Sequence, residues 1–309
     1  MKKVIAILLT MFLLTMPVLA VIDLVNEDIQ ITVSKAAVAP IIDGKLDADS
    51  YAKIPATMAD YNAYGGDDEY DDWMKANLPE AYISYDANNF YVLLIGNGSK
   101  YFYCDHDEDS EGDIWNQSCI QISVATADAS GGDRLEIGLA LNSSTKVPIS
   151  HIWAQSPDGR EEYEIVIGTN AAILLDGGKL AYEVSIPWKT FLPKDPKAGD
   201  KFGFNFIYGY SDDGNRFGVE YSYGCCNGKN ADLFAKVTIT DTVLQAAPTE
   251  APTEAPAVTD APAAPTEPPN EVAPPPPPKP IAPKVGDIGA IMLIVTMAAS
   301  GITLFRRKK

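Results

Sequence analysis

One stretch decides the fold of this chain: Asp113-Ile114-Trp115-Asn116-Gln117-Ser118-Cys119-Ile120-Gln121-Ile122-Ser123-Val124. From Cys119 onward the residues alternate, with Ile120, Ile122 and Val124 on one side and Cys119, Gln121 and Ser123 on the other. A period of two is typical of a half-buried β-strand. The run before it, 105–112, is acidic and ends in glycine, which predicts a loop. Trp115 is therefore expected where an acidic loop enters a strand.

The same alternation recurs along the chain between turn residues. Segments 81–85 and 90–95 flank the turn Asp86-Ala87-Asn88-Asn89, which predicts a β-hairpin. Phe202, Phe204, Phe206 and Tyr208 form an aromatic stripe at period two, which indicates a core strand. Residues 65–73 are acidic and predict a second loop. Further strands are predicted at 29–33, 135–141, 163–167, 180–186, 219–223 and 234–239. With no long helical pattern, the sequence predicts an all-β fold, an antiparallel β-sandwich.

Both ends of the chain differ in composition from the predicted sandwich, which occupies residues 21–245. Residues 1–20 begin with Met1-Lys2-Lys3, continue as an apolar run and end in small residues, which predicts a secretory signal peptide. Residues 246–283 are rich in Pro, Ala, Thr and Glu and predict an extended linker. An apolar run and a basic tail predict a C-terminal transmembrane helix within 284–309, a membrane or cell-wall anchor.

Charge and cysteine content narrow the environment and the partners. The formal net charge of −18 and the pI of about 4.4 argue against nucleic acid or an anionic lipid surface as the partner. The signal peptide and the basic tail together place the domain on the extracellular face of the cell. The four cysteines of an exported chain could form disulfides, and Cys104 with Cys119 is an easier pair than the adjacent Cys225 and Cys226.

The sequence contains no catalytic motif. It has no Gly-x-Ser-x-Gly elbow, no His-Glu-x-x-His pair and no phosphate-binding glycine loop, and its only histidines are His106 and His151. Carboxylates are abundant, but nothing singles out a pair for glycoside hydrolysis. We therefore expect a protein that is not an enzyme.

The first acidic run contains Asp105, Asp107 and Asp109, whose hard oxygen atoms are the ligands that Ca²⁺ prefers. The run lacks the EF-hand spacing, so the expected calcium site rests on composition, and a solvated acidic loop is the alternative. A calcium ion here would be structural.

The tryptophans are the candidate ligand contacts. A flat aromatic ring at the rim of a sandwich can stack on a sugar ring, which makes Trp115 the first candidate. The alternative is that Trp115 anchors the loop or belongs to the core. Trp73 and Trp153 lie in predicted loops, and either could form the second wall of a sugar site. Trp188 follows Pro187 at the end of a core strand and is interpreted as structural.

Five motifs follow one another along the chain: 41–47 (IIDGKLD), 83–92 (ISYDANNFYV), Asp113-Ile114-Trp115 with Ile120-Gln121-Ile122, 182–188 (YEVSIPW) and 199–205 (GDKFGFN). In this order they resemble family 9 carbohydrate-binding modules, which belong to the wider DOMON-like group of β-sandwiches. The resemblance spans residues 40–239. It implies a β-sandwich that binds plant polysaccharide or sugar ends without cleaving them, often with bound calcium.

The resemblance also implies site residues. The family holds a sugar between two tryptophans, and Trp115 matches the first by motif, whereas no tryptophan stands at the second, near 226–229. Ser118 stands where the family usually has Asp, and Gln121 where a sugar-contacting Glu is common. Tyr221 and Tyr223 lie near the vacant position and could supply the second ring. The predicted sugar-binding residues are therefore Trp115, Gln121, Tyr221 and Tyr223.

The C-terminal tail resembles a Gram-positive cell-wall sorting signal, with residues 282–287 (APKVGD) at the position of its motif. Val285 replaces the threonine that sortase attacks, which favours a plain membrane anchor. The sequence as a whole predicts a cell-surface protein that binds a plant-type polysaccharide such as xylan or cellulose. Such a protein would support polysaccharide breakdown by partner glycoside hydrolases. The alternative is a structural or adhesive surface protein that uses the sandwich against protein or wall partners.

Overall fold

The computed structural model describes residues 29–65, 68–155, 160–226 and 228–245. The predicted signal peptide, linker and C-terminal anchor lie outside these residues. Within them, no helix has the length and apolar character needed to cross a membrane. The strands are β1 (Gln30–Lys35), β2 (Ala52–Lys53), β3 (Tyr61–Gly65), β4 (Glu80–Tyr85), β5 (Asn89–Asn97), β6 (Cys119–Thr126), β7 (Leu135–Leu141), β8 (Pro148–Ala154), β9 (Ala171–Asp176), β10 (Lys179–Pro187), β11 (Lys201–Asp212), β12 (Asn215–Tyr221) and β13 (Ala235–Val243).

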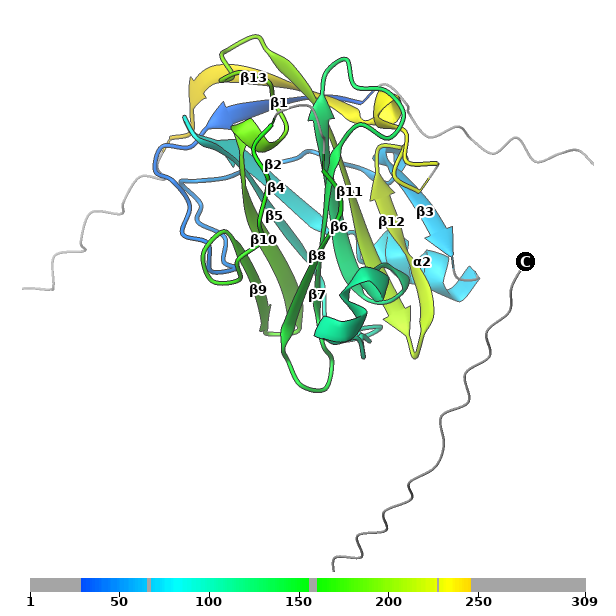
Figure 1. Ribbon diagram of the computed structural model, residues 1–309. Helices are drawn as coiled ribbons and strands as arrows, with labels where there is room; N and C mark the ends of the chain where they lie inside the picture. Colours follow the sequence, from blue (N-terminus) through cyan, green and yellow to red (C-terminus); the bar gives the residue numbers. More distant parts are fainter. Residues whose placement is uncertain (1–28, 66–67, 156–159, 227, 246–309) are drawn as a thin grey trace, which may run out of the picture. The chain divides into compact units, whose positions relative to one another are not determined.

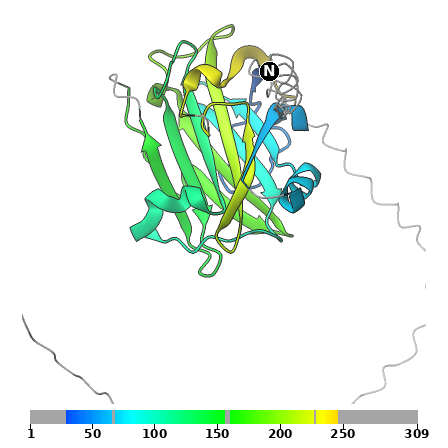
Figure 2. The same cartoon turned by 90° about the vertical axis from the view of Figure 1, so that its right-hand side faces the viewer.

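The helical elements are short. One α-helix, α2 (Asp68–Ala76), follows β3, and four 3₁₀ segments are present in the described residues: η1 (Met58–Asp60), η2 (Glu108–Asn116), η3 (Trp188–Thr190) and η4 (Ala231–Leu233). In the view of Figure 2, α2 and η2 lie on opposite sides of the domain.

The strands form the two layers of a β-sandwich (Figure 1). Hydrogen bonding joins them in the order β8-β7-β6-β11-β13-β1-β4-β5-β10-β9, with β12 beside β11, β3 beside β12, and β2 beside β4. β5 and β10 lie across the core from β11, because Phe90 of β5 meets Phe204 of β11 with ring centroids 5.5 Å apart. The predicted all-β sandwich is confirmed. Its strand pairs are antiparallel except those of β1, which runs parallel to β13 and β4.

The core fills the space between the layers with alternate residues of each strand. Ile120, Ile122 and Val124 of β6 are fully buried in it, as are the four aromatic residues of the stripe in β11. Each side chain of this size contributes about 1.5–3 kcal/mol when it leaves water. Trp188 is also fully buried, and its Nε1 donates to the Asp86 carbonyl at 3.0 Å, so its structural role is confirmed.

The structure corrects two predicted elements. The alternation at 163–167 does not form a strand, because the Gln155 amide takes the backbone groups of Tyr163 and only Ile167 makes an isolated bridge, to Ala171. The acidic segment 65–73 is not a loop throughout, because α2 begins at Asp68. Tyr70, Trp73 and Met74 are spaced for one face of that helix and pack on the core.

The motif around residues 41–47 is anchored by a buried carboxylate. Glu183 of β10 accepts hydrogen bonds from the backbone N–H groups of Asp43 (2.9 Å) and Gly44 (2.7 Å) and from the Tyr51 hydroxyl (2.7 Å). Burial raises the pKa of Glu183, although these donors partly offset that effect. The Glu183 side chain thus fixes the turn to the outer surface of its layer.

All four cysteines are free. Cys104 and Cys119 lie in one buried apolar cluster without a bond between them. The disulfide between them that the sequence suggested is therefore not formed in this structure.

Candidate functional site

The layer that contains β6, β7 and β11 is covered on its outer face at two places. At one end Ile114 of η2 packs on Cys119 of β6, Ala140 of β7 and Ile149 of β8. At the other end the loop after β12 places Cys225 and Phe234 against Ala125 and Ile207. Between the two covers a pocket of about 590 Å³ opens on the outer face of the sheet. Its lining residues are Tyr64, Gly112, Trp115, Gln121, Arg134, Glu136, Trp153, Ile207, Arg216, Cys225, Cys226 and Lys229.

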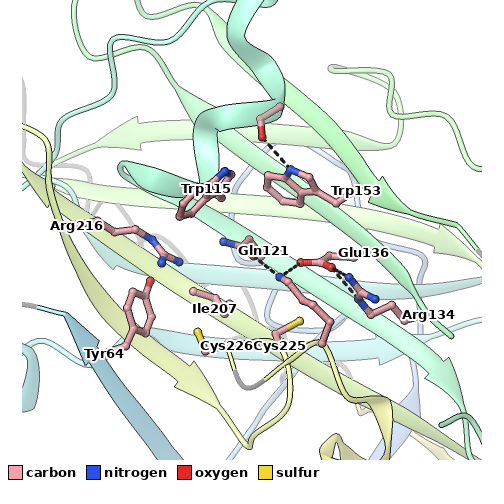
Figure 3. A pocket seen from close by; sticks show the side chains of 12 residues that line it. Tyr64, Trp115, Gln121, Arg134, Glu136, Trp153, Ile207, Arg216, Cys225 and Cys226 are labelled. Atoms are coloured by element: carbon pink, nitrogen blue, oxygen red, sulfur yellow. Dashed lines mark hydrogen bonds and ion pairs between the residues drawn. The ribbon is translucent and has the colours of Figure 1, made fainter. Parts of the chain in front are cut away.

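Figure 3 shows how the pocket side chains are arranged. Trp115 and Trp153 lie on the side of η2, and Cys225 and Cys226 lie on the opposite side. Gln121 of β6 lies between them, on the floor, as the cross-strand neighbour of Ile207. The pocket therefore combines two indole rings with a floor that is partly polar.

Trp115 is held at the rim by its neighbours in η2. The preceding Ile114 is fully buried, and the N–H of Gln117 donates to the Ile114 carbonyl at 3.2 Å, which closes the last turn. The Gln117 amide in turn holds Asp105 by hydrogen bonds of 2.6 and 2.8 Å. Trp115 itself remains 45% exposed. An exposed ring of this size on a rigidly anchored turn is a candidate ligand platform.

Trp153 reaches the pocket through an irregularity in β8. Ile137 pairs with Ile152 and Glu136 pairs with Ala154, so Trp153 is the extra residue of a β-bulge. Such bulges often re-aim a side chain beside a functional site. The Trp153 Nε1 donates to the carbonyl of Gly112 at 3.0 Å, which ties β8 to η2. The two tryptophans are thus positioned by connected elements.

Two glycines let aromatic rings lie close to the sheet. A Cβ atom at Gly138 of β7 would come within 2.3 Å of a ring carbon of Trp153. A Cβ atom at Gly218 of β12 would come within 2.5 Å of the Tyr64 hydroxyl. Any larger residue would push these rings away from the floor. The width of the pocket therefore depends on both glycines.

A buried carboxylate organises one wall. Glu136 is fully buried, and its two oxygens accept from Arg134 (Nε to Oε2, 2.7 Å) and from Lys229 (Nζ to Oε1, 2.6 Å). A buried carboxylate needs such partners, because an unpaired charge in this position costs several kcal/mol. Lys229 Nζ also lies 3.5 Å from the amide of Gln121.

A third cation stands on the opposite wall. The guanidinium carbon of Arg216 lies 4.3 Å from the ring centre of Tyr64 and 5.6 Å from that of Trp115. Both distances allow cation–π attraction. The Gln121 amide has a partner at each end when its nitrogen faces Glu136 Oε1 (3.2 Å) and its oxygen faces Arg216 Nη2 (3.3 Å). Gln121 thus connects the two charged walls.

Of the four predicted sugar-binding residues, the structure brings Trp115 and Gln121 together in the pocket. Tyr221 is fully buried and stacks on Phe206 with ring centroids 5.2 Å apart, so it cannot act as an exposed platform, and that prediction is wrong. The reason is its position in β12, where Tyr221 pairs with Phe206 and therefore points to the core face of the sheet. Tyr223 is half-buried and does not line the pocket.

The second indole ring that lines the pocket belongs to Trp153, which the sequence suggested as one of two candidates for the second wall of a sugar site. The other candidate, Trp73, lies on the core side of α2, with its ring centroid 4.8 Å from that of Tyr210. Arg216, Glu136 and Lys229 were not predicted. The alternation of His151 and Trp153 in β8 was a usable signal, but nothing local marks a single arginine or lysine as a pocket residue.

The three aspartates predicted to bind calcium have separate local roles. Asp105 accepts from Gln117 and from the Tyr103 hydroxyl, which lowers its pKa, and Asp107 caps η2 through Asp109 N and Ser110 Oγ. Asp109 is exposed. All three border one surface pocket, yet among the described residues no three His, Cys, Asp or Glu side chains are grouped so that they could hold a metal ion. The predicted ligand set is therefore not assembled in this structure.

No protein-family model matches the sequence. No curated protein matches it either. Among solved structures, the chain is similar to a family 9 carbohydrate-binding module from Caldicellulosiruptor kristjanssonii in complex with cellotriose, at 17% identity and a TM-score of 0.44, over 69% of this chain and 94% of that one. A module of the same family and organism in complex with glucose is similar at 16% identity and a TM-score of 0.44, over 70% of this chain and 100% of that one.

Proposed function

We propose that this chain is a non-catalytic carbohydrate-binding protein of the cell surface. Its ligand is a plant-type polysaccharide such as xylan or cellulose, which it holds near partner glycoside hydrolases. The observation that carries the proposal is the pocket in which the exposed Trp115 and the half-buried Trp153 lie beside a partly polar floor.

Sugar chemistry matches this arrangement. A pyranose ring presents apolar C–H groups on its faces and hydroxyl groups around its edge. An aromatic ring that keeps one face accessible can cover the C–H groups, and nearby polar side chains can hydrogen-bond the hydroxyls. Trp115 is suited to the first task, and Gln121, Arg216 and Lys229 are placed for the second. Hydroxyl groups need both donors and acceptors, and the Gln121 amide offers one of each.

The charged groups of the pocket favour binding over hydrolysis. Most glycosidases use two carboxylates that flank the scissile bond. Among the described residues that line the pocket, Glu136 is the one carboxylate, and both of its oxygens already accept from Arg134 and Lys229. Burial also raises the pKa of the Cys225 thiol, so this pocket cysteine is not an activated nucleophile.

The surface location rests on the sequence. We expect the sandwich to be held outside the cell by the predicted signal peptide, the Pro-rich linker and the apolar C-terminal segment. The structural calcium ion is a separate prediction from the sequence. An immunolabelling experiment on intact cells tests the location.

The binding proposal is tested by titrating the full-length chain, kept in mild detergent, with xylo- and cello-oligosaccharides while tryptophan fluorescence is recorded. We expect saturable quenching with wild type and at least about fivefold weaker binding with Trp115→Ala, because loss of a central aromatic contact typically costs about 1 kcal/mol or more. The matched control is Tyr223→Ala, which removes a half-buried aromatic outside the pocket and should bind as wild type does.

Two results would contradict the proposal. Equal binding by wild type and Trp115→Ala would show that this pocket is not the sugar-binding site. No binding to any saccharide would favour the other interpretation, a structural or adhesive surface protein that uses this pocket against protein or wall partners.

A further inference from the structure

We propose that the saccharide in this pocket carries a carboxylate, as a uronic acid at the end or on a branch of a neutral glycan, and that Arg216 binds that carboxylate. The inference rests on the proposed function, because it names the class of sugar that the same pocket takes. It follows from the balance of charge, from the state of Arg216 and from the position of its guanidinium beside Trp115.

The charge balance of the pocket is opposite to that of the whole chain. The chain carries a net charge of −18, yet three cations line the pocket, Arg134, Lys229 and Arg216, against one carboxylate, Glu136, among the described residues. Glu136 has two of these cations as direct partners. Glu220, behind the wall formed by Cys225 and Cys226, is fully buried, and burial raises its pKa, which favours its neutral form. The pocket is therefore locally positive.

Of the three cations among the described residues that line the pocket, Arg216 is the one without a carboxylate partner. Within the described part of the chain, Arg134 and Lys229 pair with Glu136, and Arg160 lies 3.4 Å from Asp133, whereas no ion pair involves Arg216. Its contact within hydrogen-bonding distance is the Gln121 amide, and its Nε is buried without a partner. A guanidinium has five N–H donors, and donors without partners in a buried place cost free energy. Arg216 therefore retains donors for a ligand.

The guanidinium is held beside the expected sugar platform. Tyr64, at 4.3 Å, supports it from one side, and the Trp115 ring centre lies 5.6 Å away (Figure 3). A sugar that stacks on Trp115 thus has Arg216 at its edge. A planar guanidinium matches a carboxylate by two parallel hydrogen bonds, which are stronger than its bonds to a neutral hydroxyl.

The net charge of the chain also limits the number of carboxylates. A polyuronate would bring many charges near a surface that repels anions. A single uronate on a neutral chain places its one charge in the positive pocket and leaves the rest of the ligand neutral. The structure therefore favours an isolated uronic acid over a continuous chain of them.

The test compares two ligands that differ in one group. Xylotriose that carries one glucuronic acid branch is titrated against the full-length chain beside the same oligosaccharide after reduction of its carboxylate to an alcohol. We expect the acid to bind about tenfold more tightly, which corresponds to about 1.4 kcal/mol, because a charge-assisted hydrogen bond is stronger than a neutral one. The difference should shrink as salt is added.

Three variants assign the preference to one side chain. Arg216→Gln should bind the acid and the alcohol equally well, because the variant lacks the positive charge that distinguishes a carboxylate from a hydroxyl group. Arg216→Lys, which keeps the charge and loses the fork, should show an intermediate preference. Lys201→Gln removes an exposed positive charge away from the pocket and should keep the full preference.

The outcomes separate this inference from the proposed function. Equal binding of acid and alcohol by wild type overturns the inference and leaves carbohydrate binding intact. A preference that survives in Arg216→Gln also overturns it. Tighter binding of glucose 6-sulfate than of glucuronic acid would also overturn the inference, because it would show that the pocket prefers a sulfate group to a carboxylate. Absence of binding by either oligosaccharide overturns the proposed function and the inference with it.

Discussion

In the sheet formed by β6, β11 and β12, adjacent residues of each strand point to opposite faces, and the two faces have different surroundings. On the inner face Ile122, Phe206 and Tyr221 are cross-strand neighbours, and all are buried against the opposite layer. One position further on β11, Ile207 lies between Gln121 and Glu220 on the outer face. These residues are buried too, but by η2 and by the loop after β12 instead of a second sheet.

The difference teaches where fold and function separate. The inner face is apolar, so its contribution is mainly the removal of hydrocarbon from water. The outer face carries the amides of Gln121 and Asn205, the carboxylate of Glu220 and several glycines, all of which need specific partners or specific space. A face that is only partly covered by loops leaves room for a pocket, and the pocket lies there. The predictions below compare the two faces by the free energy of unfolding, from the largest change to the smallest.

The largest loss should follow Phe206→Ala on the inner face. Phe206 is fully buried and stacks on Tyr221, so its removal leaves a cavity that the sheets cannot close. We expect a loss of about 3–5 kcal/mol, measured by urea unfolding. The smaller truncation Ile207→Val on the outer face should cost about 0.5–1.5 kcal/mol. A larger loss for Ile207→Val than for Phe206→Ala would contradict the distinction between the faces.

Gly138→Ala should destabilise the protein less than Phe206→Ala does, and it should also weaken saccharide binding. The added methyl group would overlap the Trp153 ring, which must then move or tilt. Overpacking of this kind costs about 1–3 kcal/mol. Gly132→Ala is the control, because a Cβ atom there would meet only a terminal nitrogen of Arg134 at 3.6 Å. Wild-type binding in Gly138→Ala would show that the position of Trp153 does not matter for the ligand.

Glu220→Gln should have a smaller effect that depends on pH. Burial raises the pKa of Glu220 above its ordinary value of 4.5, so ionisation costs stability in the folded state as the pH rises above 4.5. The glutamine cannot ionise, and the stability of the variant relative to wild type should therefore increase from pH 4.5 to pH 7. Urea midpoints across this range measure the difference.

Glu80→Gln serves as the control with the opposite sign. The hydrogen bond from Lys53 lowers the pKa of Glu80, so its charged form stabilises the fold above pH 4.5. This variant should lose stability relative to wild type as the pH rises through the lowered pKa of Glu80 toward 4.5. A constant difference for Glu220→Gln over the same range would mean that Glu220 titrates alike in both states.

The smallest change in stability should follow Trp115→Ala. The side chain is 45% exposed, and substitutions at such positions away from the core usually alter the free energy of unfolding by no more than about 0.5 kcal/mol. The same variant should lose most of the binding of saccharide. Unfolding of Trp115→Ala would instead place this tryptophan with Phe206 as part of the fold.

The sequence alone was sufficient for the sandwich, for most of its strands and for one wall of the pocket. Alternation with a period of two is a local property, and the aromatic stripe of β11 and the hairpin of β4 and β5 could be predicted from it. Trp115 could be predicted because an aromatic residue before a strand stands out within a few residues. The local pattern failed at 163–167, where a side-chain amide replaces strand pairing, and at α2, where the acidic residues concealed a helical spacing of aromatics.

Tertiary structure decided which face each residue joins and what covers it. Gln121 was expected on an open face, yet it is buried, because η2 and the loop after β12 close over a face that no strand pattern describes. Tyr221 points into the core, whereas Ile207 points to the outer face, because successive residues of a strand face opposite sides of the sheet. A shift of one residue in the strand register would exchange the two faces. The meeting of Arg216, Trp115 and Gln121 needs strands that lie far apart in the sequence. Contacts of that kind depend on the folded chain, so local sequence patterns carry no signal for them.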